Sequence, residues 1–441
     1  MAGPAIRAWE LARVLARSFE VKLAVPGDPG LEADGFGWLT YGLGGAGRWE
    51  AAEDAAQEWA DVVIASGHLL QSLPFLRELR VPLVADVYIP GPLEALARQA
   101  TAEPGLQMKA YERAWQVARL VARYADWLVC ASERQRAFWL GVLAACGRLR
   151  PELYAADADL RNLVDTVPFG CPKEPPQPAP VLRGAWPGIG REDQVLVWGG
   201  GVWNWFDPVT LLRAMPGVLA RHPSARLVFL GSDHPHPERV AHMERAEEAR
   251  ALGRGLGLEG RSLFWLGWVP YAERGAYLLE ADVGVSLHGS GAEPYFAFRT
   301  RLLDLVWAGL PAVVTRGDVL GEELEARGLA LGVEPGDVEA VAAAINTLLD
   351  EPEARRSRQA GFDDLCKRYR WDRVCEPLQR FCAAPRLDAS KQQAAAQSEG
   401  GWSSERAALQ EQINRLQSVV HGYESGRLMQ LMAALRGRRR R

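Results

Sequence analysis

The sequence of 441 residues lacks the features that mark several large classes of protein. It has no run of about 18 consecutive apolar residues, so it predicts no transmembrane helix. The six cysteines are scattered without a C-x-x-C pair, which argues against a zinc ribbon or a disulfide framework and favours a reducing compartment. The net charge is only −4, so charge gives no reason to expect a nucleic-acid partner. Charged residues at positions 7, 10 and 13 interrupt the apolar residues of the N-terminus, so this segment is not predicted to be a signal peptide.

What is present is typical of a globular protein with two large domains. Hydrophobic residues make up 48% of the chain and charged residues 24%. Short apolar segments such as "DVVIASG" and "QVLVWGG" alternate with helical patterns, which predicts parallel sheets covered by helices on both faces. We therefore expect an α/β fold with two Rossmann-like domains that face a cleft, followed by a helical C-terminal tail.

The domain boundaries follow from changes in composition. The sequence predicts a first Rossmann-like domain (1–172), a proline-rich linker (173–193), a second Rossmann-like domain (194–368), a helix that packs back towards the first domain (369–384), a disordered linker (385–404) and an amphipathic helix with a basic end (405–441). The first domain opens on a helix although such a domain usually opens on a strand. Either this strand is absent or the start codon lies upstream, and we favour the second explanation.

The segment "VLVWGGGVWNWFDPVTLLRAMP" (195–216) has the pattern of a phosphate-binding loop but no cation in the loop. Three glycines between a strand and a helix usually allow backbone N–H groups to approach a phosphate. Here the loop carries Trp203, Asn204 and Trp205 and no cation, and no lysine occurs between Arg191 and Cys366. The missing positive charge must therefore come from elsewhere if the loop binds a phosphate. Asp207 and Pro208 predict the N-cap and the first residue of the following helix.

A second segment (285–315) supplies candidate charges. His288 ends a strand, and Glu293, Arg299, Arg301 and Asp304 follow within sixteen residues (304 − 288). We expect a helix from about residue 298, whose N-terminus and two guanidinium groups would bind an anion. A carboxylate one turn deeper could accept two hydrogen bonds from a ribose diol. Alternatively, Arg299 and Asp304 pair on the helix surface, and the two indoles serve only for packing between domains.

Neither candidate metal motif is convincing. The D-x-D sequence at 157–159 lies in an expected solvated turn, and the two histidines at 234 and 236 lack a third ligand. We therefore predict no metal site.

Together, the motifs "WGGGVWNWFDP", "GWVPY", "FRTRLLDLVWAGLP" and "CASERQRAFWLG" resemble a subgroup of the family 4 retaining glycosyltransferases, which have the GT-B fold and use nucleotide-sugars. The resemblance covers about residues 1–382. Asp304 occupies the place of the second glutamate of the family pattern and Glu293 that of the first, at a longer spacing than the family has (304 − 293 = 11).

The residue patterns and this resemblance together give the candidate site residues. Glu293, Arg299 and Arg301 are the predicted catalytic residues, with the arginines supplying the charge that the glycine loop lacks. The predicted donor-binding residues are Gly200, Gly201, Trp203, Asn204, Trp205, Gly231, Val269, His288 and Asp304. His68 and Asp86, at the ends of first-domain strands, are the predicted acceptor-binding residues.

The implied function is transfer of a sugar from a nucleotide-sugar to a glycan or lipid-linked acceptor in bacterial cell-surface polysaccharide synthesis, with retention and without metal or cofactor. The alternatives are an inactive GT-B scaffold or another GT-B enzyme such as a nucleotide-sugar epimerase. The basic tail (405–441) predicts either peripheral contact with an anionic membrane or self-association. We expect a cytoplasmic protein, with the inner face of the plasma membrane as its possible location.

Overall fold

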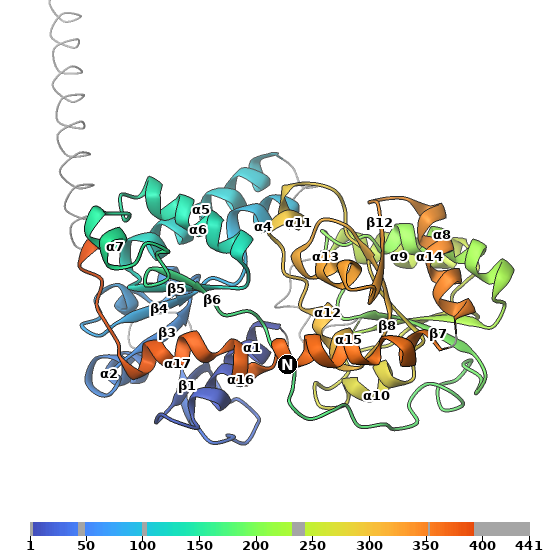
Figure 1. The fold of residues 1–441 in the computed structure, drawn as a ribbon, viewed down its shortest axis with the longest axis horizontal. Helices are drawn as coiled ribbons and strands as arrows, with labels where there is room; N and C mark the ends of the chain where they lie inside the picture. The colour runs from blue at the N-terminus through green and yellow to red at the C-terminus, as the bar shows by residue number, and fades with distance from the viewer. Residues whose placement is uncertain (1–2, 43–48, 99–103, 232–242, 352, 392–441) are drawn as a thin grey trace, which may run out of the picture.

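The computed structural model describes residues 3–42, 49–98, 104–231, 243–351 and 353–391. Two α/β halves lie side by side, and the chain crosses between them twice (Figure 1). The predicted α/β fold with two parallel-sheet domains is confirmed. The C-terminal helix predicted after residue 404 lies outside the described residues, as does the histidine pair at 234 and 236.

The second half is built on a six-stranded sheet in which every neighbouring pair is parallel. Its strands are β7 (Gln194–Gly199), β8 (Ala225–Leu230), β9 (Leu263–Trp265), β10 (Val283–Ser286), β11 (Ala312–Thr315) and β12 (Ala330–Val333). The spatial order is β12-β11-β10-β7-β8-β9. The chain therefore winds outward in both directions from the adjacent strands β7 and β10. In open sheets of this kind, ligands bind beyond the carboxyl ends of the strands at that reversal point.

Helices cover both faces of this sheet. They are α8 (Pro208–Arg221), α9 (Glu244–Gly255), α10 (Arg274–Leu279), α11 (Ala292–Phe296), α12 (Arg301–Trp307), α13 (Val319–Ala326), α14 (Val338–Asp350) and α15 (Ala354–Arg368). Helix α8 begins as the sequence predicts: Asp207 accepts a hydrogen bond from the Thr210 amide at 3.0 Å, and Pro208 is the first helical residue. Helix α12 begins at Arg301, three residues later than expected, and has only seven residues.

The first half contains two separate parallel sheets. Strands β3 (Val63–Ser66), β4 (Leu83–Asp86), β5 (Trp127–Cys130) and β6 (Val164–Thr166) form one sheet in this order, whereas β1 (Lys22–Pro26) and β2 (Gly37–Tyr41) pair only with each other. The described helices are α1 (Gly3–Leu15), α2 (Glu50–Asp54), α3 (Leu69–Ser72), α4 (Gly91–Arg98), α5 (Pro104–Tyr124), α6 (Glu133–Ala145) and α7 (Pro151–Ala156). The first element in the described residues is α1.

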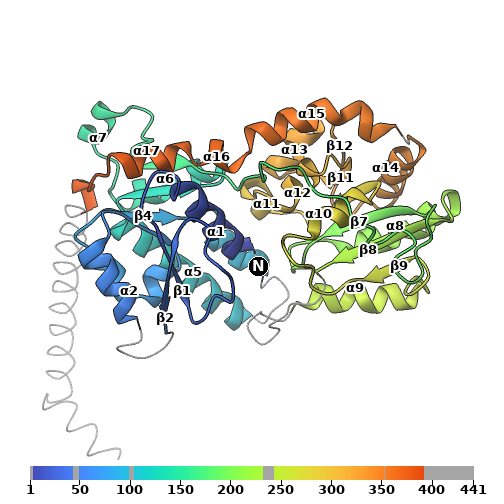
Figure 2. The ribbon, with the colours of Figure 1, turned by 90° about the horizontal axis from the view of Figure 1, so that it is seen from below.

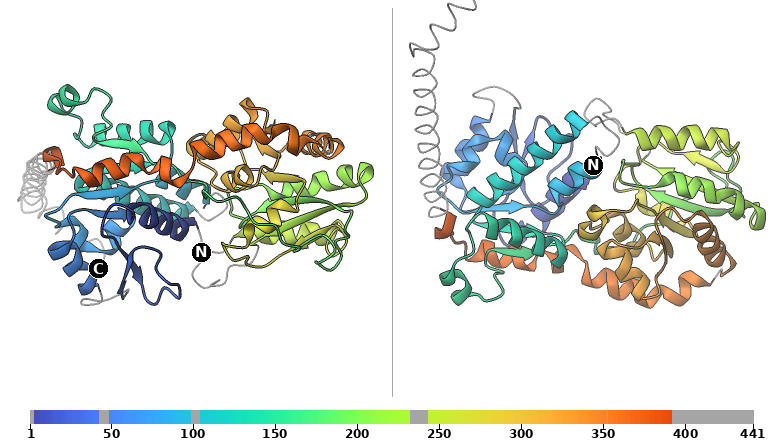
Figure 3. Two further views of the ribbon diagram at one scale, coloured as in Figure 1. Left: turned by 60° about the horizontal axis from the view of Figure 1, so that its bottom comes forward. Right: turned by 90° about the horizontal axis from the view of Figure 1, so that it is seen from above.

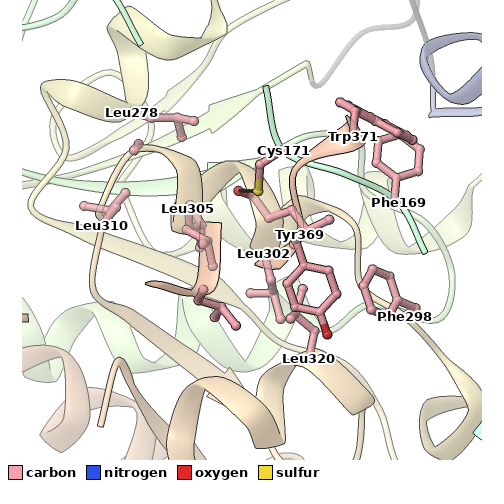
Figure 4. Packing of buried hydrophobic residues seen from close by; sticks show 14 of the residues in the cluster. Phe169, Cys171, Leu278, Phe298, Leu302, Leu305, Leu310, Leu320, Tyr369 and Trp371 are labelled. Atoms are coloured by element: carbon pink, nitrogen blue, oxygen red, sulfur yellow. Dashed lines mark hydrogen bonds between the residues drawn. The ribbon is translucent and has the colours of Figure 1, made fainter. Parts of the chain in front are cut away.

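The two crossings between the halves pack directly against each other. Residue Cys171, on the first crossing, pairs with the second crossing: its amide donates to the Tyr369 carbonyl at 2.7 Å, and its carbonyl accepts from the Trp371 amide at 3.2 Å. A side chain at Gly170 would place its Cβ 2.5 Å from the Trp371 ring, so only glycine fits there. The crossings run through the large apolar core drawn in Figure 4.

After the second crossing, the chain returns to the first half through α16 (Trp371–Val374) and α17 (Glu376–Ala383), as Figure 2 and Figure 3 show. The Phe381 ring stacks on Trp127 of β5 with centroids 4.6 Å apart. Such an aromatic pair adds about 0.5–1.5 kcal/mol of stabilisation beyond that from its buried area.

The proline-rich segment is also anchored, because one Glu280 carboxylate oxygen accepts hydrogen bonds from the amides of residues 181, 182 and 183. Among the helices that the structure describes, none combines the length and apolar character needed to cross a membrane.

Candidate functional site

Two glycine loops meet at the carboxyl end of β7. Gly200 has φ +99° and Gly231, after β8, has φ +68°, both in the left-handed region that favours glycine. A Cβ on Gly231 would lie 3.8 Å from the Gly200 Cα, and the Gly231 amide donates to the Gly267 carbonyl at 3.1 Å. The loops after β7, β8 and β9 are therefore joined at the reversal point of the sheet. Val269, two residues further on, is half-buried.

Arg301 extends from the start of α12 to this glycine loop. Its Nη2 atom donates to the Gly201 carbonyl at 2.7 Å, and its guanidinium group lies 3.7 Å from the Phe206 ring centroid. No described carboxylate pairs with it, and its Nη1 atom is buried without a hydrogen-bond partner. Burial, followed by repulsion from Arg299, lowers the pKa of Arg301 to about 9. An uncompensated buried cation is unfavourable, so an anion at the glycine loop would relieve it.

Arg299 has a different environment from Arg301. Its two terminal nitrogens donate to the two carboxylate oxygens of Glu293 at 3.0 and 2.5 Å, and both side chains are less than one tenth exposed. The charges of Arg299 and Glu293 therefore compensate each other. The sequence did not reveal that Arg299 pairs with Glu293, and the catalytic roles of these two residues stay predictions.

Asp304 pairs with an arginine that the sequence reasoning missed. Arg274 Nε donates to Asp304 Oδ1 at 2.9 Å, and the same guanidinium group lies 3.7 Å from the Tyr271 ring centroid. The alternative that Asp304 pairs with Arg299 is therefore wrong. The Asp304 side chain is 38% exposed, so it remains accessible to a ligand. Arg274 follows the "GWVPY" loop by three residues, and this position was the signal that could have identified it.

The two indoles of the glycine loop stack on each other. Trp203 and Trp205 are parallel, with ring centroids 5.6 Å apart, and both are half-buried against the apolar cluster of the second half. Asn204 Oδ1, between them, accepts a hydrogen bond from the amide of Arg245. The indoles thus pack against the second half, and the packing between domains that the alternative expects stays a prediction. This packing leaves their predicted contact with a donor open.

His288 is buried just after β10, next to the glycine loop. It is only 1% exposed, its Nδ1 lies 2.9 Å from the Gly289 carbonyl, and its Nε2 faces Asp318 at 3.6 Å. Residues Phe206 and His288 form a backbone bridge that joins the glycine loop to the end of β10. Through these contacts, His288 helps to hold the glycine loop in place. Its direct contact with a donor stays a prediction.

The first half contains a pocket of about 620 Å³ at the carboxyl ends of β3 and β4. Both predicted acceptor residues line it, together with Tyr88, Arg113 and Trp139, which sequence reasoning missed. Burial lowers the pKa of His68, whose Nδ1 lies 2.9 Å from the Ser66 hydroxyl. Parallel strand ends thus bring His68 and Asp86 into one pocket, as the sequence indicates.

Asp86 is also part of a buried ion pair. Arg7 of α1 donates to its two carboxylate oxygens at 2.6 and 2.9 Å, and to the Val167 and Pro168 carbonyls. The Arg7 side chain is only 1% exposed. These contacts hold α1 against β4 and the segment after β6. Asp86 therefore both lines the pocket and anchors α1 beside it.

Helix α11 connects the pocket side to the glycine-loop side. Gln135 of α6 donates to the Phe296 carbonyl at 3.0 Å, and the Phe138 and Phe296 rings are in edge contact. Arg134 donates to the Gly317 carbonyl at 3.1 Å and pairs with Glu322 of α13. The helix that carries Glu293 is therefore held by both halves of the protein. Within the described ranges, no three metal-ligating side chains converge.

Comparisons with known proteins agree with this architecture. Residues 193–351 match the family described as glycosyl transferases group 1. No curated protein matched the sequence. Among solved structures, sucrose-phosphate synthase from Thermosynechococcus elongatus aligns with a TM-score of 0.61 at 14% identity, covering 86% of this chain and 92% of that one.

Two further structures are similar. Anabaena HepE in complex with UDP-glucose aligns with a TM-score of 0.63 at 15% identity, covering 87% of this chain and 96% of that one. The structure described as trehalose-6-phosphate from E. coli bound with UDP-2-fluoro glucose aligns with a TM-score of 0.59 at 14% identity, covering 88% of this chain and 97% of that one. At these identities the likeness establishes the fold. The chain thus has the two-domain GT-B glycosyltransferase fold, and residues 193–351 match the glycosyl transferase group 1 family.

Proposed function

We propose that the protein is a retaining, metal-independent glycosyltransferase that takes its sugar from a nucleotide-sugar bound at the glycine loops of the second half. The observation that carries this proposal is the buried Arg301 guanidinium, which contacts Gly201 and has no described carboxylate partner. Its location beyond the ends of β7 and β10 is where sheets of this topology bind ligands. Two of the similar structures contain UDP-sugars, which supports the same donor class here.

In the proposed reaction, the bond between the anomeric carbon and the diphosphate breaks. Negative charge then develops on the leaving diphosphate, where Arg301 and the amides of the glycine loop stabilise it. Asp304 would accept hydrogen bonds from the ribose, and the Trp203–Trp205 stack would exclude water. In a retaining reaction on one face of the sugar, the departing phosphate itself takes the acceptor proton. The compensated Glu293–Arg299 pair would keep α11 in position between donor and acceptor.

The acceptor in this proposal enters the pocket of about 620 Å³ in the first half. His68 and Asp86 lie at its strand ends, and α11 links this side to the donor side. We propose a glycan or lipid-linked acceptor of bacterial cell-surface polysaccharide synthesis, used at the inner face of the plasma membrane. The basic residues at 437–441 support this location.

A thermal-shift screen against nucleoside-diphosphate sugars tests the donor class. A ligand at a hundred times its Kd stabilises the native state by about 2.7 kcal/mol, so at least one donor should raise the Tm by several degrees. The same donor should then release nucleoside diphosphate in a turnover assay. If no donor shifts the Tm or is turned over, the inactive GT-B scaffold becomes the better assignment.

Replacing Asp304 with asparagine should weaken donor binding about tenfold, because a neutral amide accepts ribose hydrogen bonds less strongly than a carboxylate. The free energy of unfolding should change by less than about 1 kcal/mol, since the Asp304–Arg274 pair is partly exposed. Titration of the donor by calorimetry measures the effect. The matched control is Asp364→Asn, which breaks the exposed pair with Arg327 and should leave donor affinity unchanged. An unchanged Kd for Asp304→Asn would remove the ribose role.

Removing residues 392–441 should abolish flotation with anionic vesicles, because the basic end of the chain is lost. The cut belongs after Lys391, since Lys391 pairs with Asp126 at 2.7 Å and Ser390 accepts from Arg148 at 3.0 Å. Full-length protein on neutral vesicles is the control for charge. Equal flotation of the two forms on anionic vesicles would eliminate the membrane proposal and favour self-association.

A further inference from the structure

The two crossings between the halves bring two cysteines from distant parts of the sequence into contact. Cys171 lies on the first crossing, and Cys366 lies in the last turn of α15, just before the second. Cys366 packs against the apolar core that contains Cys171, and the interaction between the two thiols raises the pKa of Cys171 and lowers that of Cys366. Cys171 is 1% exposed in the apolar core, whereas Cys366 is half-buried at its edge. Neither residue has a part in the proposed sugar transfer.

The backbone around Cys171 leaves little room for the pair to separate. The hydrogen bonds from Cys171 to Tyr369 and from Trp371 to Cys171 fix the first crossing to the segment that follows α15. Tyr369 is three residues beyond Cys366, which is about one helical turn. Figure 4 shows Cys171 surrounded by Tyr369, Trp371 and the α12 leucines. This backbone pairing therefore holds Cys171 beside the last turn of α15, which carries Cys366.

We propose that Cys171 and Cys366 are a redox-active thiol pair whose oxidation to a disulfide fixes the two crossings to each other. The proposal does not depend on the sugar-transfer function. All six cysteines are free thiols in the structure, and Cys171 and Cys366 lie on the two crossings that connect the halves.

The two thiols are suited to different steps. The interaction with Cys171 lowers the pKa of Cys366, so the accessible cysteine is the better nucleophile. The same interaction and burial raise the pKa of Cys171. With a small disulfide such as glutathione disulfide as oxidant, the Cys366 thiolate attacks one of its sulfurs, the S–S bond breaks, and one glutathione leaves as thiolate.

The second step closes the protein disulfide. Cys171 loses its proton to water and attacks the Cys366 sulfur of the mixed disulfide, and the second glutathione leaves. Two protein thiols are thereby oxidised while one glutathione disulfide is reduced to two glutathiones. Because the Cys171 sulfur also lies 3.6 Å from the Leu303 carbonyl of α12, the new bond competes with a contact to the helix that carries Arg301.

Mass spectrometry of the full chain after incubation with glutathione disulfide tests the proposal. After alkylation and digestion without reductant, we expect a linked peptide pair that contains Cys171 and Cys366 and disappears after dithiothreitol. Cys366 should react about tenfold faster than Cys382, a half-buried cysteine whose pKa burial raises to about 11. Cys382→Ser is the matched control and should leave the linkage intact.

Two variants identify the order of the steps. Cys366→Ser should not form the linkage, whereas Cys171→Ala should accumulate glutathione on Cys366 because the second thiol is missing. The Tm of each variant, measured in the reduced state, shows that it is folded. The proposal is overturned if fully oxidised wild-type protein contains no Cys171–Cys366 linkage, or if Cys382 reacts as fast as Cys366.

Discussion

Replacing Arg301 with alanine should lower kcat for sugar transfer by about 10²- to 10³-fold, because the leaving diphosphate loses its main charged partner. The variant should fold normally. Among the described residues, Arg301 donates a hydrogen bond to Gly201 and forms no ion pair, so its removal deletes a desolvated charge instead of leaving one behind. The Tm should therefore stay the same or rise. Release of nucleoside diphosphate from the donor found by thermal shift measures kcat.

Controls separate this role from a general effect of removing a cation. Arg301→Lys keeps a charge but loses the planar fork, so it should recover only part of the activity. Arg316→Ala removes an exposed arginine that pairs with Glu325 and Glu334 and should leave kcat unchanged. An Arg301→Ala protein that is folded and retains wild-type kcat would contradict the electrostatic role.

Replacing Arg7 with alanine should destabilise the protein by about 3–5 kcal/mol, since it leaves the Asp86 carboxylate buried without its partner. The carbonyls of Val167 and Pro168 lose their donor as well. Unfolding in urea, followed by tryptophan fluorescence, gives the free energy. Adding Asp86→Asn to Arg7→Ala should restore part of the loss, because the uncompensated charge is then absent.

The matched control lies on the same helix. Arg13→Ala removes an arginine of α1 that is 37% exposed in its pairs with Glu10 and Asp34, and it should cost clearly less than Arg7→Ala because the Arg13 guanidinium is partly in water and Glu10 keeps the Tyr271 hydroxyl as a partner. A loss for Arg7→Ala as small as that for Arg13→Ala would show that the Arg7–Asp86 pair does not stabilise the first half.

The sequence predicted the parts of the structure that depend on local patterns. Apolar runs located the strands, and Asp207-Pro208 located the start of α8. The strand-end rule also placed His68 and Asp86 in one pocket. In each case the deciding information lies within a few neighbouring residues or in the direction of a parallel strand.

Pairing between charged side chains could not be predicted in this way. Arg299 is two residues from Arg301, yet α11 brings Glu293 to the first and no carboxylate to the second. The late start of α12 contributes to this difference, because Arg299 lies in the irregular segment between α11 and α12. Arg7 and Asp86 are 79 residues apart, so only the tertiary fold reveals that they pair. The contact between Cys171 and Cys366 depends on both crossings for the same reason.

The most direct test of the central claim is a crystal structure of the protein with the nucleoside diphosphate of its preferred donor. The account predicts that the diphosphate lies over Gly200 and Gly201, with its oxygens about 2.7–2.9 Å from the terminal nitrogens of Arg301. A diphosphate bound elsewhere, with Arg301 still directed only at the Gly201 carbonyl, would contradict the account.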